Sequence, residues 1–229
     1  MKINSSQIES LYAFTRNHYV EYYDLQTELV DHLANDIEAM WQKQPNLPFE
    51  DAKNKAFKKF GIFGFMEPIM QKQKAMSKRY MRYLWNELKK WFTIPQIALT
   101  ITMFLIFYLA FTTSYAKYFA IVFYGFIAVW CFYKNIQLNR QFRRRKELSN
   151  KKWMLEEMIF KQASGIGIIF LSQLFSIFDL TNKFSTNTYG VLALSLVFTI
   201  LVLINYISLE LLPNKAEKLI NETYPEFSL

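Results

Sequence analysis

Residues 189–212 read YGVLALSLVFTILVLINYISLELL, an apolar run whose single charged residue, Glu210, stands near its end. Three further stretches of this kind precede it, over residues 94–113, 118–133 and 158–178. Each is close to the roughly 20 residues that an α-helix needs to cross about 30 Å of hydrocarbon. The sequence therefore predicts an all-α integral membrane protein with four transmembrane helices in residues 94–213.

Lysine and arginine are concentrated in every second connection between these stretches. Residues 72–93, before the first stretch, carry seven of them, and residues 134–157, between the second and the third, carry eight. The connections after the first and third stretches hold only Lys117 and Lys183. Because loops rich in Lys and Arg stay on the cytoplasmic side, we expect a multi-pass protein of a bacterial inner membrane with both termini in the cytoplasm.

The same basic residues account for the net charge of +8. Residues 1–71 hold seven basic and ten acidic side chains, a local net charge of −3. Basic clusters beside apolar spans are typical of contact with anionic lipid headgroups rather than with nucleic acid, which we do not expect this chain to bind directly. The residues expected to contact headgroups are Lys78, Arg79, Arg82, Arg143, Arg144 and Arg145.

The polar first third of the chain predicts a small cytoplasmic helical domain over residues 1–71. Ser6 and Glu9 are spaced as a capping box for a first helix. A second helix is expected over residues 20–44 because apolar side chains recur there at steps of three and four. These are Leu25, Leu29, Leu33, Ile37, Met40 and Trp41.

A third helix is expected to begin at Pro48 and to stop at Gly61 in a left-handed conformation. Residues 72–93 then form a basic juxtamembrane helix, and residues 214–229 form a cytoplasmic tail. Residues 1–17 are polar, so no cleavable signal peptide is expected.

Few residues suggest catalysis or a bound cofactor. Glu28, His32 and Asp36 share one face of the second helix, where a divalent metal can bind. A solvated helix face is the favoured interpretation, because His18 is the only other histidine and no HExxH motif occurs. Cys131 is the only cysteine, which excludes an intramolecular disulfide and a cysteine metal site. No hydrolase or phosphate-binding motif occurs. We therefore expect no enzyme, no metal and no cofactor.

Polar residues inside the spans are small or carry amides. Gly165 and Gly167 suit close helix contact, and Gln173 and Asn205 suit hydrogen bonds between helices. Buried carboxylates, which an ion-coupled transporter normally needs, are missing from the centres of the spans. Helix packing is the favoured interpretation, and a transport path is the alternative.

Residues 23–38, YDLQTELVDHLANDIE, are followed by Pro48-Phe49-Glu50-Asp51-Ala52 and then Lys59-Phe60-Gly61. This order resembles the HAAS-type signalling domain, a helical module that precedes membrane spans in many bacterial proteins. The resemblance covers about a third of the chain and implies signalling or protein binding, with a PadR-like transcriptional regulator as the partner. It implies no catalytic residue.

The favoured hypothesis is an integral membrane signalling or adaptor protein whose cytoplasmic domain binds a protein partner. Complementary charge sets encounter rate and specificity, so the expected contact residues are the acidic side chains of the second helix, Glu28, Asp31, Asp36 and Glu38. The alternative is a small-solute transporter or a transporter subunit. Self-association of the chain is left open.

The distribution of Lys and Arg generates a test of topology. Reporter fusions after Thr113 and after Lys183 are expected to read as periplasmic, whereas fusions at Arg144 and at the C-terminus are expected to read as cytoplasmic. Alkaline phosphatase and green fluorescent protein fusions measure this. A periplasmic signal at Arg144 would overturn the four-span topology.

Overall fold

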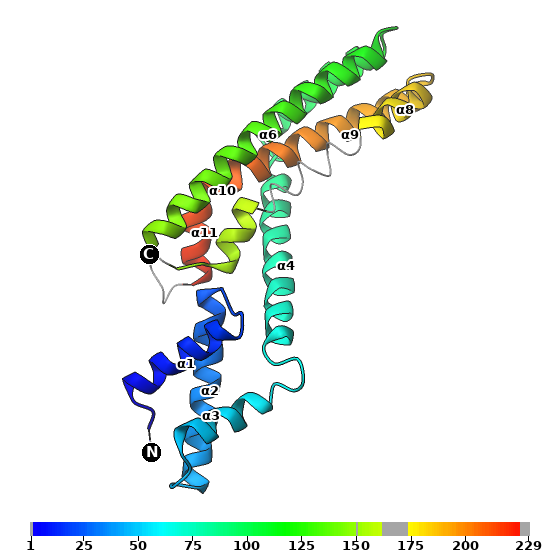
Figure 1. Cartoon of the computed structure of the whole chain (residues 1–229). Helices are drawn as coiled ribbons and strands as arrows, with labels where there is room; N and C mark the ends of the chain where they lie inside the picture. Colours follow the sequence, from blue (N-terminus) through cyan, green and yellow to red (C-terminus); the bar gives the residue numbers. More distant parts are fainter. Residues whose placement is uncertain (1, 150, 162–173, 225–229) are drawn as a thin grey trace. The chain divides into compact units, whose positions relative to one another are not determined.

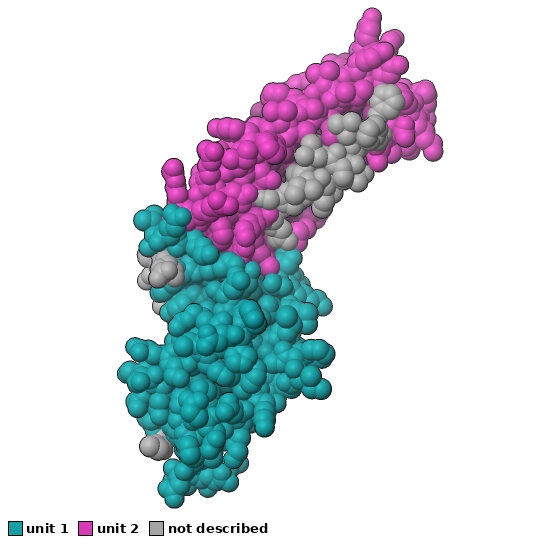
Figure 2. Space-filling view, viewed as in Figure 1, with its two compact units in different colours: residues 1–78, 146–155 teal, residues 79–145, 156–229 magenta. Residues whose placement is uncertain are grey.

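The computed structural model describes residues 2–149, 151–161 and 174–224, and these residues form helices and turns without any β-strand (Figure 1). The predicted all-α fold is thereby confirmed over these ranges. The chain divides into two compact units, which Figure 2 colours separately: unit 1 is Met1–Lys78 with Lys146–Leu155, and unit 2 is Arg79–Arg145 with Glu156–Leu229.

Unit 1 is built on α2 (Tyr23–Lys43), against which α1 (Ser5–Asn17) and α3 (Phe49–Lys58) pack. The apolar stripe of α2 forms its core, since Leu25, Leu29, Leu33 and Ile37 are at most 2% exposed. Trp41 is also buried and donates its ring N–H to the carbonyl of Leu47 at 2.8 Å. Met40 is only half-buried, at the edge of the stripe.

The predicted capping box at Ser6 and Glu9 is wrong by two residues. Asn4 caps α1, because its side-chain oxygen accepts the amide of Gln7 at 2.8 Å. The Gln7 side chain in turn accepts the amide of Asn4 at 3.0 Å. Asn and Gln thus fill the two capping roles for which the prediction used Ser and Glu.

The connection from α3 to α4 (Met66–Lys90) contains two glycines with positive φ. Gly61, at φ +76°, ends α3 in the left-handed conformation, as predicted. Gly64, at φ +52°, also lies against the ring of Phe57, where an added Cβ would come within 2.8 Å of the ring carbon Cζ. A side chain at Gly64 would therefore displace the Phe57 ring.

A short segment far along the chain, residues 151–155, completes unit 1 at the start of α2. The amide of Tyr23 donates to the carbonyl of Lys152 at 2.8 Å. The amide of Met154 donates to the carboxylate of Asp24 at 3.3 Å. The ring of Trp153, 1% exposed, packs edge-on against Tyr23 with centroids 5.5 Å apart. Residues 154–161 continue as a helix.

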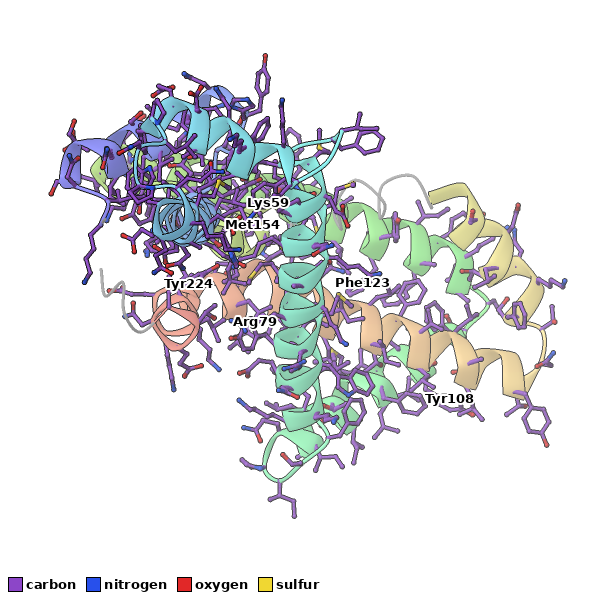
Figure 3. All side chains as sticks on the ribbon, turned by 90° about the horizontal axis from the view of Figure 1, so that it is seen from below. Lys59, Arg79, Tyr108, Phe123, Met154 and Tyr224 are labelled. Carbon is purple, nitrogen blue, oxygen red and sulfur yellow. The ribbon has the colours of Figure 1, made fainter. Side chains whose placement is uncertain are left out.

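Unit 2 has an aromatic core formed by α5 (Gln96–Phe111), α6 (Ala116–Ser149) and α9 (Thr188–Tyr206). Phe111 and Phe198 meet edge-on at 4.9 Å, and Phe107 meets Phe123 at 5.0 Å. Figure 3 shows Phe123 and Tyr108 among the side chains of this unit. Edge-to-face rings add stability beyond the area they bury.

The turn from α8 (Leu174–Phe184) to α9 depends on Gly190, whose added Cβ would lie 2.0 Å from the carbonyl oxygen of Phe184. Asn187 caps α9 by accepting the amide of Gly190 at 2.6 Å. Any side chain at Gly190 would therefore collide with backbone.

Two of the described helices are long and apolar enough to cross a membrane, Ala116–Leu148 and Thr188–Asn214, whereas the sequence predicted four spans. The first predicted span, residues 94–113, forms the shorter α5, because turns enclose it on both sides. At 1.5 Å per residue its 16 residues cover about 24 Å. Most of the third predicted span, residues 158–178, lies outside the described residues. The helix that contains the second continues well beyond Tyr133 to Ser149.

Polar contacts join α4 to the C-terminal part of unit 2. A π-helix (Ile207–Leu211) follows α9 and leads through α10 (Leu212–Asn214) to α11 (Ala216–Thr223). Glu87 accepts hydrogen bonds from Lys90 at 2.8 Å and from Lys215 at 2.9 Å. The hydroxyls of Tyr83 and Thr223 lie 3.3 Å apart. Residues that precede α5 and residues that follow the π-helix therefore form one end of unit 2.

The buried stripe of α2 generates a prediction about stability. Leu33→Ala removes a side chain with no exposed surface, which typically costs about 2–5 kcal/mol. In hydrogen-exchange mass spectrometry of the full-length protein, the amides of α2 are expected to exchange at least about 30-fold faster. His32→Ala, at an exposed position of the same helix, is the control. Equal protection in the two variants would contradict this account of the core.

The Glu87 contacts generate a prediction about pH. Burial of the Glu87 carboxylate raises its pKa, but the hydrogen bonds from Lys90 and Lys215 outweigh burial, so the pKa lies below the ordinary 4.5. The ionised carboxylate therefore stabilises the fold above pH 4.5, and this contribution is lost as pH falls through the folded-state pKa. Glu87→Gln is expected to lower the melting temperature at pH 7 and to lower it much less at pH 3.5. An equal deficit at both values would refute the assignment.

Candidate partner-binding groove

Unit 1 contains a groove of about 680 Å³ beside α2, which we call the α2 groove. One wall is α2, and the other is the first half of α4 together with the residues that follow α3. Its lining residues include both apolar and polar or charged side chains: Leu25, Glu28, Leu29, His32, Asp36, Lys59, Phe60, Pro68, Gln71, Lys72, Ala75 and Met76. The groove thus combines an apolar floor with a charged rim.

Two ion pairs bridge the rim of the α2 groove. The Nζ atom of Lys72 lies 2.6 Å from a carboxylate oxygen of Glu28, and the Nζ atom of Lys59 lies 2.8 Å from Asp36. Glu28 and Asp36 are eight residues apart on one face of α2, so the two pairs stand two helical turns apart. Exposed ion pairs of this kind add little stability. Their effect is to fix opposite charges at defined places on the rim.

His32 lies between the two ion pairs on the same face of α2, and its side chain is exposed. Leu25 and Leu29 of α2 and Met76 of α4 are buried lining residues and form the floor, while Ala75 of α4 is an exposed lining residue. An apolar floor with a polar rim is the general design of a protein-recognition surface. An amphipathic helix can place its apolar side chains in such a groove and its polar ones on the rim.

The other two acidic residues expected at a partner surface lie on the opposite flank of α2. Glu38 accepts a hydrogen bond from the amide of Ile3 at 3.0 Å, which fastens the start of the chain. Asp31 is exposed. Burial is the main cause that raises the pKa of Tyr12, a residue of α1, and the negative charge of Asp31 makes a small further contribution. The structure therefore brings Glu28 and Asp36 together in one groove and separates them from Asp31 and Glu38.

The face of Glu28, His32 and Asp36 was also considered as a metal site. Among the described residues, no group of three or more His, Cys, Asp or Glu side chains is arranged to hold a metal ion. The carboxylates of Glu28 and Asp36 are engaged by lysines. The thiol of Cys131 is buried and donates to the side-chain oxygen of Asn205 at 3.2 Å.

Of the four residues expected to join membrane helices, only Asn205 lies within the described residues. Asn205 is 1% exposed, and besides Cys131 it contacts the carbonyl of Leu201, to which its amide group donates at 2.8 Å. The Cys131 contact links α6 to α9. Gly165, Gly167 and Gln173 lie outside the described residues.

The residues expected at lipid headgroups are mostly exposed. This holds for Lys78, Arg82, Arg143 and Arg144, whereas Arg79 is half-buried. Arg145 instead pairs with Glu156 at 2.7 Å, where it closes the connection after α6.

Sequence reasoning missed the basic half of the α2 groove. Lys72 was assigned to the juxtamembrane helix, and Lys59 entered only as part of the stop after the third helix. Each meets a carboxylate of α2 that lies more than 20 positions away along the chain. A helical pattern reports which residues share a face but not which distant helix faces them. No family model, curated protein or solved structure matches the chain.

Proposed function

We propose that this protein is a membrane-bound signalling adaptor whose cytoplasmic unit 1 binds a helical segment of a protein partner in the α2 groove. The observation that carries this proposal is the groove itself, an apolar floor framed by the Lys72–Glu28 and Lys59–Asp36 ion pairs. It belongs to a chain that also contains apolar helices of membrane length. The occupant is an amphipathic helix with charges that complement the rim.

The membrane part of the proposal is four transmembrane helices with both termini in the cytoplasm. Lys215, after the π-helix, pairs with Glu87, which precedes α5. Lys134 pairs with Glu210, near the ends of the second and fourth predicted spans. Two residues that form an ion pair at the membrane surface lie on the same side of the membrane. Each of these two ion pairs therefore supports an even number of membrane-spanning helices between its two residues. The apolar side chains exposed on α6, among them Val122, Phe126 and Val129, support contact with lipid.

The resemblance of residues 23–61 to the HAAS-type domain suggests the class of partner. We propose a PadR-like transcriptional regulator, which this chain would hold at the inner membrane. Nucleic acid would then be bound by the partner and not by this chain. Lipid would be the other partner, through the exposed basic residues beside the spans.

Charge exchange within the ion pairs tests the groove. In the variant Glu28→Lys/Lys72→Glu, and likewise in Asp36→Lys/Lys59→Asp, each ion pair is retained with its direction reversed. Folding and net charge are therefore preserved, but each rim position now carries the opposite charge. A partner whose charges complement the wild-type rim would be repelled there. Recovery of co-purified partner from mild detergent, measured by quantitative mass spectrometry, is expected to fall several-fold. The loss is expected to be larger at low salt than at high salt.

The matched control is Lys218→Glu/Glu222→Lys, which reverses an exposed pair of α11 in unit 2. It is expected to leave partner recovery unchanged. A second comparison is Glu9→Lys/Asp31→Lys, which changes exposed acids outside the groove. Loss of the partner in this variant alone would move the contact surface away from the groove. Solute flux in reconstituted vesicles that is lost on Asn205→Leu, with partner recovery intact in every variant, would instead favour the transporter.

A further inference from the structure

A second cavity of unit 1 has a different chemical character from the α2 groove. It measures about 840 Å³ and lies at the start of α2, where residues that follow α6 approach. We call it the basic cavity, and its lining residues are Arg16, Val20, Glu21, Tyr23, Gln26, Lys146, Lys151 and Lys152. Four cations and one carboxylate give the lining a formal charge of +3, in a unit whose first 71 residues carry −3.

Two of the four cations are held by contacts of the fold. Lys152 pairs with Glu21 at 2.5 Å, and its Nζ atom lies 4.6 Å from the centroid of the Tyr22 ring. The Nζ atom of Lys151 lies 4.4 Å from the centroid of the Tyr23 ring. Aromatic faces stabilise a cation without neutralising it. Positive charge is therefore fixed at this place before any ligand arrives.

The backbone around the basic cavity is also fixed. Lys152 accepts the amide of Tyr23 through its carbonyl, so the segment that carries Lys151 and Lys152 is tied to α2. The amide group of Gln26, a residue only 6% exposed, donates to the carbonyl of Val20 at 2.6 Å and holds the residues between α1 and α2. Arg16 extends from α1, and Lys146 from the last turn of α6. Because these groups are already held in place, a ligand that binds here loses less free energy to ordering the protein.

From this arrangement we infer that the basic cavity binds a phosphate group. Lysine and arginine are the side chains that recognise phosphate by charge-assisted hydrogen bonds. The volume exceeds that of an inorganic phosphate and lies in the usual range for small-molecule sites. The phosphate therefore belongs to a larger molecule, either the headgroup of an anionic lipid or a soluble phosphate ester. This site is separate from the α2 groove and stands without the proposed partner.

Pyrophosphate is the probe for this site, titrated by calorimetry into the full-length protein in phosphatidylcholine nanodiscs. The test variant is Arg16→Gln/Lys146→Gln, which removes two exposed cations that lie on different helices. Saturable binding to the wild type is expected, and the variant is expected to bind roughly tenfold more weakly or worse. The matched control, Lys55→Gln/Lys58→Gln, removes the same charge from exposed positions of α3 and is expected to bind as the wild type does.

Nanodiscs that contain 30% phosphatidylglycerol separate the two sources of phosphate. If the lipid headgroup fills the basic cavity, these discs weaken pyrophosphate binding to the wild type, and if the ligand is soluble, binding is unchanged. Both outcomes support a phosphate site. The inference is overturned if the wild type shows no saturable binding in phosphatidylcholine discs. It is also overturned if the two double variants lose affinity equally, because binding would then follow net charge alone.

Discussion

The hydrogen bond from the amide of Tyr23 to the carbonyl of Lys152 fixes the start of α2, on which both cavities of unit 1 depend. The first amides of any α-helix lack partners within the helix. Most helices meet this need with a neighbouring Ser, Thr, Asp or Asn, but the N-cap of α2 is Tyr22, which makes no side-chain capping hydrogen bond. The acceptor comes instead from a segment that follows α6. The position of α2 is thus set by a part of the chain that lies beyond the apolar residues of α5 and α6.

This arrangement makes unit 1 discontinuous in sequence. Its helices α1 to α3 are complete by Lys58, yet Trp153, Met154 and Leu155 are buried and at most 1% exposed. Chains generally fold from the N-terminus during synthesis. Unit 1 therefore acquires its last buried side chains only after α5 and α6 have been made. Completion of unit 1 therefore follows synthesis of the first two apolar helices.

Local patterns in the sequence predicted much of unit 1. Leu25, Leu29, Leu33 and Ile37 were assigned to one buried face from their spacing alone, and Gly61 was assigned its left-handed conformation from its place after a helix. Both inferences need only neighbouring residues, because helix geometry and backbone sterics act over a few positions. The predicted N-cap of α1 was wrong for a local reason, since Asn4 precedes Ser6 and is an equally good N-cap residue.

The candidate sites were harder to predict than the core. Of the four acidic residues expected at a partner surface, Glu28 and Asp36 line the α2 groove, whereas Asp31 and Glu38 do not. Lys59 and Lys72 were not identified as ion-pair partners, and the basic cavity was not predicted. Arg16 and Lys146 entered the sequence analysis only through the counts of basic residues in residues 1–71 and 134–157. Both line the basic cavity because segments that are far apart in the sequence come together there. A periodic pattern within one helix does not reveal such long-range contacts. The helix over residues 94–113 was also predicted too long, because the hydropathy of a segment does not show at which residues its flanking turns begin.

The π-helix over Ile207–Leu211 gives the C-terminal part of unit 2 a tolerance to changes in chain length. A π-turn accommodates one residue more than the same turn of α-helix. Loss of one residue from this segment is therefore expected to convert it to α-helix and to keep the Lys215–Glu87 contact of the intact chain. Loss of one residue from the middle of α9 has no such remedy, and it turns everything that follows by about 100°. Related chains that differ in length by a single residue are therefore expected to place the difference in this turn.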